Sequence, residues 1–418
     1  MINMIPIILI TLYYYTHFIE GTYSFFIPLC SSLFWLIHSF TICNISVVLF
    51  NKESRWWMAY AFISIMMTVL GFSSTNLSFF ISRLPYYLLP PMGYFIIRKY
   101  NLKEIKTLLC FIVIIFLANL IYNINLWVIL PNVFELQESS ELSIQYGVLM
   151  NIATTSFIAV CLFSIGCCYM LWETVHGKLF KITILIFCGL NVFYILFVNS
   201  RGTAVLLLLV EIIALLVARF EPRKNSRKLY YFSSTVIIIS VASFVIVPLL
   251  LWIIQNLDSA RLAERFEDFI SFTRSSGDVN SLSEGSMAQR IALAETSLRS
   301  FLSIPLSILI GIGDHTVSVG MDLHKSGIGN HSEFIDVLGR YGLLGAFVFY
   351  KILKTYYNKL RSLTNKRIIL KYTNVVFLTF ILYGFLNNVF TPVIEIFIFI
   401  VMPMIIILTN NSMLNYER

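Results

Sequence analysis

The recurrence of apolar stretches about twenty residues long constrains this chain more than any other feature, because a helix of that length crosses the hydrocarbon core of a bilayer. Hydrophobic residues make up 58% of the 418 residues and charged residues only 12%, whereas soluble domains average about 25% charged residues. The chain has too little polar surface to cover a soluble fold of its size. The sequence therefore predicts an all-α, polytopic transmembrane helical bundle.

About twelve membrane-spanning helices are predicted from the lengths of these stretches. They lie at 4–19, 24–50, 56–72, 77–97, 106–130, 146–172, 178–198, 201–218, 229–254, 334–354, 367–388 and 391–409. The apolar run after Met4 has neither a basic region nor a small-residue cleavage site, so we expect an uncleaved first span. Three prolines in the fourth span, Pro85, Pro90 and Pro91, predict a kink or a break there.

The distribution of charge predicts the orientation. Most of the 30 basic residues fall in alternate connections between the predicted spans, while the connection at 131–145 is acidic. Cytoplasmic loops carry the excess of Lys and Arg. We therefore expect both termini in the cytoplasm. The chain then divides into 1–254 with nine spans, 255–333 as one large outer loop, and 334–418 with three spans and a short tail.

The large outer loop is expected to contain amphipathic helices. An apolar stripe at alternating spacings of three and four predicts one of them, which lies against the membrane or the bundle. Its members are Met287, Ile291, Ala294, Leu298 and Phe301. The segment 258–270 is a candidate for another. The apolar run 303–312 is too short to span and is either re-entrant or packed on the bundle.

Arg201 is the first candidate for function. It opens the eighth predicted span at the outer face, where a cation opposes the helix dipole. An anion bound between the guanidinium and the free N–H groups of the helix would explain this position. The plainer reading is an arginine that reaches the lipid phosphates.

His331 is the second candidate, because it lies at the outer mouth of the tenth predicted span, within a glycine-rich region. A histidine there can act as a general base or as a hydrogen-bond donor to a leaving phosphate. A capping or surface role is the alternative. Glu333, in the first turn of the same span, either contacts substrate or complements the helix dipole.

Ionisable and amide groups inside the predicted spans form the third set of candidates. They are Arg83, Glu211, Arg340, Asn387, Asn388 and Glu395. Such groups are costly in hydrocarbon and usually face a cavity or one another. All but Glu211 lie in the outer part of their spans, which predicts an outward-facing polar cavity; internal ion pairing is the alternative. In the outer loop, Arg290 and Arg299 flank the apolar stripe and are candidates for binding a lipid diphosphate.

Several classes of function are not indicated. The sequence has no Walker loop, dinucleotide fingerprint, nucleophile elbow or HExxH motif, and no metal site or cofactor is expected. The net charge is +8, but no basic patch of the nucleic-acid-binding type occurs. We therefore expect no nucleic-acid partner.

Four short motifs, in this order along the chain, resemble those of the O-antigen polymerase and O-antigen ligase superfamily. They are Ser200-Arg201-Gly202, Gly311-x-Gly313, His331-Ser332-x-Phe334 and Gly342-Leu343-Leu344-Gly345. The span number and the late, large outer loop also agree with that superfamily. Two departures are Ser332, where Asn is more usual, and the lack of an Arg-x10-Gly repeat. The choice between polymerase and ligase stays open.

The resemblance implies a metal-independent membrane glycosyltransferase in the bacterial inner membrane. Its donor would be a polyprenyl-diphosphate-linked oligosaccharide repeat unit, and it would build O-antigen or capsular polysaccharide at the outer face. Arg201 and Arg290 would bind the diphosphate, and His331 would deprotonate the acceptor hydroxyl or orient the donor. Membrane lipids are the other expected partners, and a chain-length regulator is a further candidate. A flippase for the same lipid-linked unit is the rival from another class, and a membrane anchor or sensor is a third reading.

Overall fold

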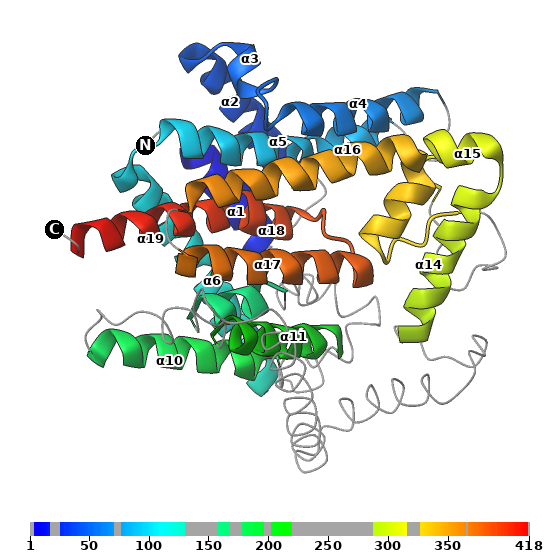
Figure 1. Cartoon of the computed structure of the whole chain (residues 1–418). Coiled ribbons are helices and arrows are strands. Elements are labelled where there is room, and N and C mark those ends of the chain that lie inside the picture. Colours follow the sequence, from blue (N-terminus) through cyan, green and yellow to red (C-terminus); the bar gives the residue numbers. More distant parts are fainter. Residues whose placement is uncertain are drawn as a thin grey trace, which may run out of the picture. The chain divides into compact units, whose positions relative to one another are not determined.

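The computed structural model describes residues 4–16, 26–70, 77–129, 157–166, 178–195, 202–219, 287–315, 327–364 and 367–416. Every regular element within these ranges is helical (Figure 1), which confirms the predicted all-helical class. The predicted span 229–254 and the candidate helix 258–270 lie outside the described residues.

The described helices overlap the other predicted spans, except for α14 and α15, which lie in the predicted large outer loop. They are α1 (Ile5–Thr16), α2 (Phe26–Ile42), α3 (Ile45–Val48), α4 (Arg55–Val69), α5 (Leu77–Lys99), α6 (Leu102–Ile129), Phe157–Gly166, α10 (Lys178–Phe193), α11 (Gly202–Arg219), α14 (Met287–Leu302), α15 (Pro305–Ile310), α16 (Glu333–Leu363), α17 (Arg367–Leu386), α18 (Pro392–Glu395), the π-helix η4 (Ile396–Val401) and α19 (Met402–Tyr416).

Two of the described helices are long and apolar enough to cross a membrane, Leu102–Asn125 and Pro392–Asn410. Shorter apolar helices accompany them. Large apolar side chains of α6, including Phe111, Ile114 and Ile121, lie on the surface. Exposed apolar surface of this kind on an all-helical protein indicates association with a membrane. The number of spans and their orientation remain predictions.

The chain divides into two compact units. The first comprises Met1–Thr155, Arg290–Ile369 and Gly384–Arg418, and the second comprises Ser156–Gln289 and Leu370–Tyr383. In the first unit, η4 is completely buried. The ring of Phe399 on this π-helix lies 5.2 Å from the ring of Trp57 on α4 and 4.7 Å from that of Tyr356 on α16. Aromatic packing around η4 therefore forms the core of the first unit.

A single continuous helix, α5, contains all three prolines that predicted a kink or break, so the break does not occur. Much of its second half is buried, and packing against neighbouring helices offsets the hydrogen bonds that proline removes.

Helix α14 is present as predicted. Its buried side chains are Ala292, Leu293, Thr296, Ser297 and Ser300, whereas Leu298 of the predicted apolar stripe is exposed. The stripe was predicted to lie against the membrane or the bundle. Here the small and hydroxylated residues point inward, because their side chains bond to neighbouring backbone and carboxylate groups.

Candidate functional site

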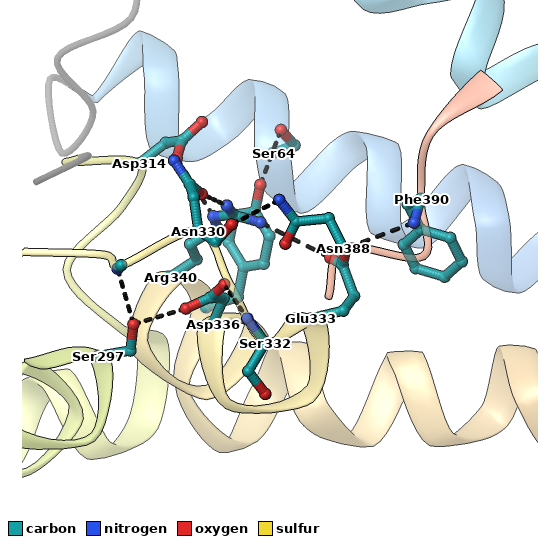
Figure 2. A network of polar contacts seen from close by, with 12 residues as sticks. Ser64, Ser297, Asp314, Asn330, Ser332, Glu333, Asp336, Arg340, Asn388 and Phe390 are labelled. Atoms are coloured by element: carbon teal, nitrogen blue, oxygen red, sulfur yellow. Dashed lines mark hydrogen bonds and ion pairs between the residues drawn. The ribbon is translucent and has the colours of Figure 1, made fainter. Parts of the chain in front are cut away.

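A buried ion-pair cluster around Arg340 is the centre of the candidate site (Figure 2). The guanidinium of Arg340 lies 3.2 Å from Asp314 Oδ1 and 3.6 Å from Glu333 Oε1. It also donates a hydrogen bond to the side-chain oxygen of Asn330. Asp336 attracts the same guanidinium electrostatically. Two carboxylates therefore pair with one cation, and these interactions offset the cost of removing Arg340 from water.

A kink in α16 explains how Arg340 is positioned. Gly342 has φ +61° and ψ −157°, which are non-helical values that glycine adopts without a steric penalty. A kink of this kind interrupts the helical hydrogen-bond ladder and leaves carbonyl groups without helical donors. The carbonyls of Gly339 and Arg340 accept hydrogen bonds from the N–H groups of Ile312 and Gly313, at 2.9 and 3.0 Å. The backbone that carries Asp314 is thereby held against Arg340.

A second anchor ties the first turn of α16 to α14. Ser297 on α14 donates a hydrogen bond of 2.5 Å to Asp336 Oδ1 and accepts one of 2.9 Å from the Gly329 N–H. The other carboxylate oxygen of Asp336 accepts the Ser332 N–H at 3.1 Å, so Asp336 satisfies one of the donors at this helix start. Figure 2 shows Ser297, Asp336 and Ser332 in this arrangement.

The interruption between α17 and α18 supplies the third side of the cluster. Asn388 in this break donates a 2.7 Å hydrogen bond to the carbonyl of Asn330, and the Phe390 N–H lies 3.4 Å from Glu333 Oε2 (Figure 2). The Glu333 N–H in turn approaches the Asn387 carbonyl at 3.3 Å. Asn330 has a φ of +56°, a left-handed conformation that Asn tolerates better than most residues. Segments far apart in the sequence therefore meet at residues 330–340.

A cavity of about 520 Å³ opens beside this cluster within the first unit. Eight aromatic residues line it: Tyr13, Tyr14, Trp57, Tyr60, Tyr86, Tyr87, Tyr341 and Phe390. Its polar lining comes from Asn330, Glu333, Arg340, Asn388, Thr391 and Glu395. The cavity thus combines flat apolar ring surfaces with carboxylate and amide groups.

Hydrogen bonds and ring contacts hold the aromatic wall in place. The phenol oxygens of Tyr87 and Tyr341 lie 2.9 and 3.1 Å from the hydroxyl of Ser64 on α4. The rings of Tyr60 and Tyr341 pack edge to face with their centroids 5.3 Å apart. Because these side chains have fixed partners, the wall is preorganised.

Some cavity-lining residues carry buried polar atoms without a hydrogen-bond partner in the described part of the chain. Among these atoms are Trp57 Nε1, Asn388 Oδ1 and Thr391 Oγ1. The Trp57 side chain is only 1% exposed. Buried polar atoms are normally paired with protein or with a bound molecule.

The structure brings some of the sequence-derived candidates together and leaves others apart. Arg340 and Glu333 form an ion pair, and both line the cavity with Glu395. His331 is half-buried next to Asn330, which also lines the cavity. Arg299 instead forms an exposed pair with Glu295 on α14, at 2.6 Å, and is not part of the cavity lining.

Other candidates lie beyond what the structure describes. Arg201 falls outside the described residues, although α11 begins at Gly202, directly after it. Arg83 on α5 and Arg290 on α14 have described backbones only, so their side chains cannot be assigned to the cavity.

Sequence reasoning missed the aromatic wall and Asp336. Tyrosines are frequent throughout the chain, 22 in all, so composition does not single out those on α1, α4 and α5. Asp336 had a local signal, because it follows Ser332 by four residues at the start of an apolar run, a pattern related to helix capping.

Glu211 belongs to a separate cluster in the second unit. Its carboxylate is fully buried and accepts hydrogen bonds from the hydroxyls of Ser164 and Thr379, the latter at 2.8 Å. Its bonding there agrees with the alternative reading of in-span polar groups, in which they hold the fold together.

No family model matches the sequence, and a search of curated proteins finds no match. Among the described residues, no group of three His, Cys, Asp or Glu side chains is arranged to hold a metal ion.

Proposed function

We propose that this protein is a membrane glycosyltransferase that polymerises lipid-linked oligosaccharide repeat units into a surface polysaccharide. The observation that carries the proposal is the cavity of about 520 Å³, in which aromatic rings, carboxylates and amides surround one space. Cavities that hold small ligands have volumes of about 300–1,000 Å³. The space therefore suits one or two sugar rings.

The chemistry of the lining favours a carbohydrate. Aromatic faces pack against the C–H groups of a sugar ring through apolar contact. Carboxylates such as Glu333 and Glu395 can accept hydrogen bonds from sugar hydroxyls.

The charge of the cavity suggests which substrate it takes. Glu333 and Glu395 contribute two carboxylates to the lining, and the single cation, Arg340, already pairs with Asp314 and Glu333. A diphosphate would be repelled there. We therefore assign the cavity to the sugars of the acceptor, and we assign the diphosphate of the donor to Arg201, with Arg290 and Arg83 as further candidates.

The proposed reaction needs no nucleotide and no metal, because the donor is already activated by its diphosphate. An acceptor hydroxyl attacks the anomeric carbon of the donor, and the bond from that carbon to the diphosphate oxygen breaks. His331 takes the proton of the attacking hydroxyl. Arg201 stabilises the negative charge that develops on the departing polyprenyl diphosphate. Attack from the face opposite the leaving group inverts the anomeric configuration.

The proposal includes a location. The protein would cross the bacterial inner membrane about twelve times, as the number of apolar stretches suggests. Both termini would lie in the cytoplasm, in line with the charge distribution. The site would then face the outer leaflet. The alternative is a ligase, in which the same site takes the same donor but uses the lipid A core as the acceptor.

One observation favours a second candidate, a transporter of the lipid-linked unit. The helical structure is interrupted between α17 and α18, and the π-helix η4 follows α18 directly. Interrupted helices near a polar cavity are a feature of transporters, where they bind cargo. A transporter would bind the sugar in this cavity without chemical change.

Complementation of a deletion strain tests the proposal. Surface polysaccharide is resolved on a gel after complementation with wild type, Arg201→Ala, His331→Ala or Glu395→Gln. Arg299→Ala is the matched control, because Arg299 is an exposed arginine outside the cavity. We expect single repeat units without a ladder for Arg201→Ala and His331→Ala, shortened ladders for Glu395→Gln, and a normal ladder for the control, at equal membrane levels.

Other outcomes identify the alternatives. Full-length polymer left on the lipid carrier and absent from the lipid A core would indicate a ligase. Lipid-linked units retained at the inner face would indicate a flippase. A normal ladder in the deletion strain itself would remove the protein from the pathway and refute the proposal.

A further inference from the structure

Helix α15 and the residues on either side of it form an apolar surface that no described part of the chain covers. Leu302, Ile304, Leu306 and Leu309 are 59%, 54%, 52% and 58% exposed. The segment from Ser300 to Gly313 contains no charged residue. Exposed apolar surface concentrated in one short segment marks a binding or membrane surface. We call these four side chains the α15 apolar surface.

Two serines of the same segment, Ser300 and Ser307, turn inward. The hydroxyl of Ser307 lies 2.6 Å from the Ile304 carbonyl and 2.8 Å from that of Phe301, and the Ile304 N–H lies 3.1 Å from the same hydroxyl. Ser300 bonds both to the N–H and to the carbonyl of Gly327, at 2.7 and 2.8 Å. Polar groups are therefore satisfied within the protein, while leucine and isoleucine side chains point away from it.

Non-helical backbone enters a bilayer only where its polar groups find partners inside the protein. The turn between α14 and α15 and the backbone that follows α15 meet this condition. The Gly311 N–H bonds to the Ser307 carbonyl at 2.8 Å, and the next two N–H groups bond to carbonyls at the kink of α16. In water, by contrast, nothing favours turning serines inward and leucines outward.

The α15 apolar surface continues onto α16. Helix α15 packs against α16 (Figure 1), and the backbone of Leu309 lies against Gly342 at the kink. Directly after the kink, Leu343, Leu344 and Phe347 are also about half exposed. They belong to the predicted tenth span, where such side chains face lipid. One apolar surface therefore extends from a predicted span to a segment that the sequence assigned to the outer loop.

We propose that α15 and its flanking residues are inserted into the outer leaflet as a re-entrant segment, with the α15 apolar surface in contact with lipid acyl chains. The inference rests on the membrane placement within the proposed function, but it does not depend on the reaction. Its consequence for the site is direct, because α15 leads into the backbone that carries Asp314. The acyl-chain region of the bilayer then helps to hold one wall of the ion-pair cluster.

Site-specific fluorescence in proteoliposomes tests the proposal. The full-length chain, with its seven native cysteines replaced by alanine, carries a single cysteine at Leu306→Cys or Leu309→Cys, labelled with an environment-sensitive dye. Glu295→Cys on α14 is the matched control, because the Glu295 side chain is 49% exposed in an ion pair with Arg299. Iodide in the buffer and nitroxide groups on phosphatidylcholine acyl chains serve as the two quenchers. Each variant must elute like the cysteine-free parent on size exclusion.

We expect the dye at positions 306 and 309 to emit at shorter wavelength than the dye at 295, to lose most of its fluorescence to the nitroxide lipids and to be little affected by iodide. The dye at 295 should show the reverse. Quenching of 306 and 309 by iodide, and not by lipid, would overturn the proposal. Protection from both quenchers, together with disulfide-linked dimers of the unlabelled Leu306→Cys protein, would also overturn it and identify a protein–protein contact.

These readings do not depend on glycan synthesis. Normal lipid quenching with an unaltered polysaccharide ladder in the deletion strain would refute the proposed function and leave the re-entrant segment intact. If iodide quenches the dye at 306 and 309 in proteoliposomes, and the deletion strain still loses its polysaccharide ladder, only the re-entrant segment is refuted.

Discussion

Removal of the Arg340 side chain should destabilise the first unit far more than removal of an exposed arginine. Arg340→Met keeps a long side chain but leaves Asp314 and Glu333 buried without their cation. With an effective dielectric constant of about 20, Coulomb's law gives a gross attraction of about 5 kcal/mol for each pair at these distances. Desolvation offsets much of this, and loss of one partner from a buried pair costs about 3–5 kcal/mol in practice.

The assay is thermal unfolding of the purified protein in one detergent, followed by loss of the monodisperse peak on size exclusion. For a chain of this size, a loss of about 3–5 kcal/mol corresponds to a fall in Tm of about 3–6 °C. Arg299→Ala removes an exposed pair within one helix, worth about 0.3–0.5 kcal/mol, and should hardly change Tm.

A double variant separates the loss of charge balance from the loss of packing. Glu333→Gln combined with Arg340→Met removes one carboxylate together with the cation. If uncompensated charge is the main cost, the double variant should have a higher Tm than Arg340→Met alone. Equal Tm values for Arg340→Met and Arg299→Ala would refute the reasoning, because the cluster would then contribute no more than a surface pair.

Three further predictions concern other parts of the structure. Gly342→Ala should lower Tm by several degrees, because the new Cβ would lie about 2.5 Å from the backbone of α15 and residue 342 has a positive φ. Gly189→Ala is the control, because nothing lies within 4 Å of a Cβ added there, and equal effects of the two substitutions would contradict this reasoning. Ser297→Ala should speed amide hydrogen exchange in the first turn of α16 and cost about 1–3 kcal/mol, since a buried carboxylate loses its donor; unchanged exchange would count against the link to α14. Glu211→Leu should lower Tm, because it removes the carboxylate that accepts hydrogen bonds from the buried hydroxyls of Ser164 and Thr379, of which Thr379 retains the Val375 carbonyl at 3.1 Å. The added substitution Ser164→Ala should restore part of the loss, and simple additivity of the two effects would argue against the cluster.

The helical architecture was predictable because runs of about twenty apolar residues leave few alternatives. The same reasoning placed Arg340 and Glu395 at similar depth, and both line the cavity. The pairing of Arg340 with Asp314 was beyond such reasoning, since it depends on the kink at Gly342 and on the path of residues 311–313. Single-sequence patterns give the position of a residue along a helix, but not which distant backbone segment will lie beside it.

Helix α14 shows a different limit. Periodicity located the helix and left open whether its apolar stripe faces the membrane or the bundle. The side chains that pack against the protein are Ser297, Ser300 and Thr296 with two small or apolar neighbours, and Leu298 of the stripe is exposed. The pattern therefore gives the period of the helix, but not the direction in which each face points.

The kink in α16 holds residues 312 and 313 through the backbone carbonyls of Gly339 and Arg340, while the Arg340 side chain holds Asp314 by charge. Backbone bonds do not change when a side chain is replaced. The shape of this wall and its charge can therefore vary separately, and paired changes at Arg340 and Asp314 offer a route to redesign which ligands enter the cavity without rebuilding the fold around it.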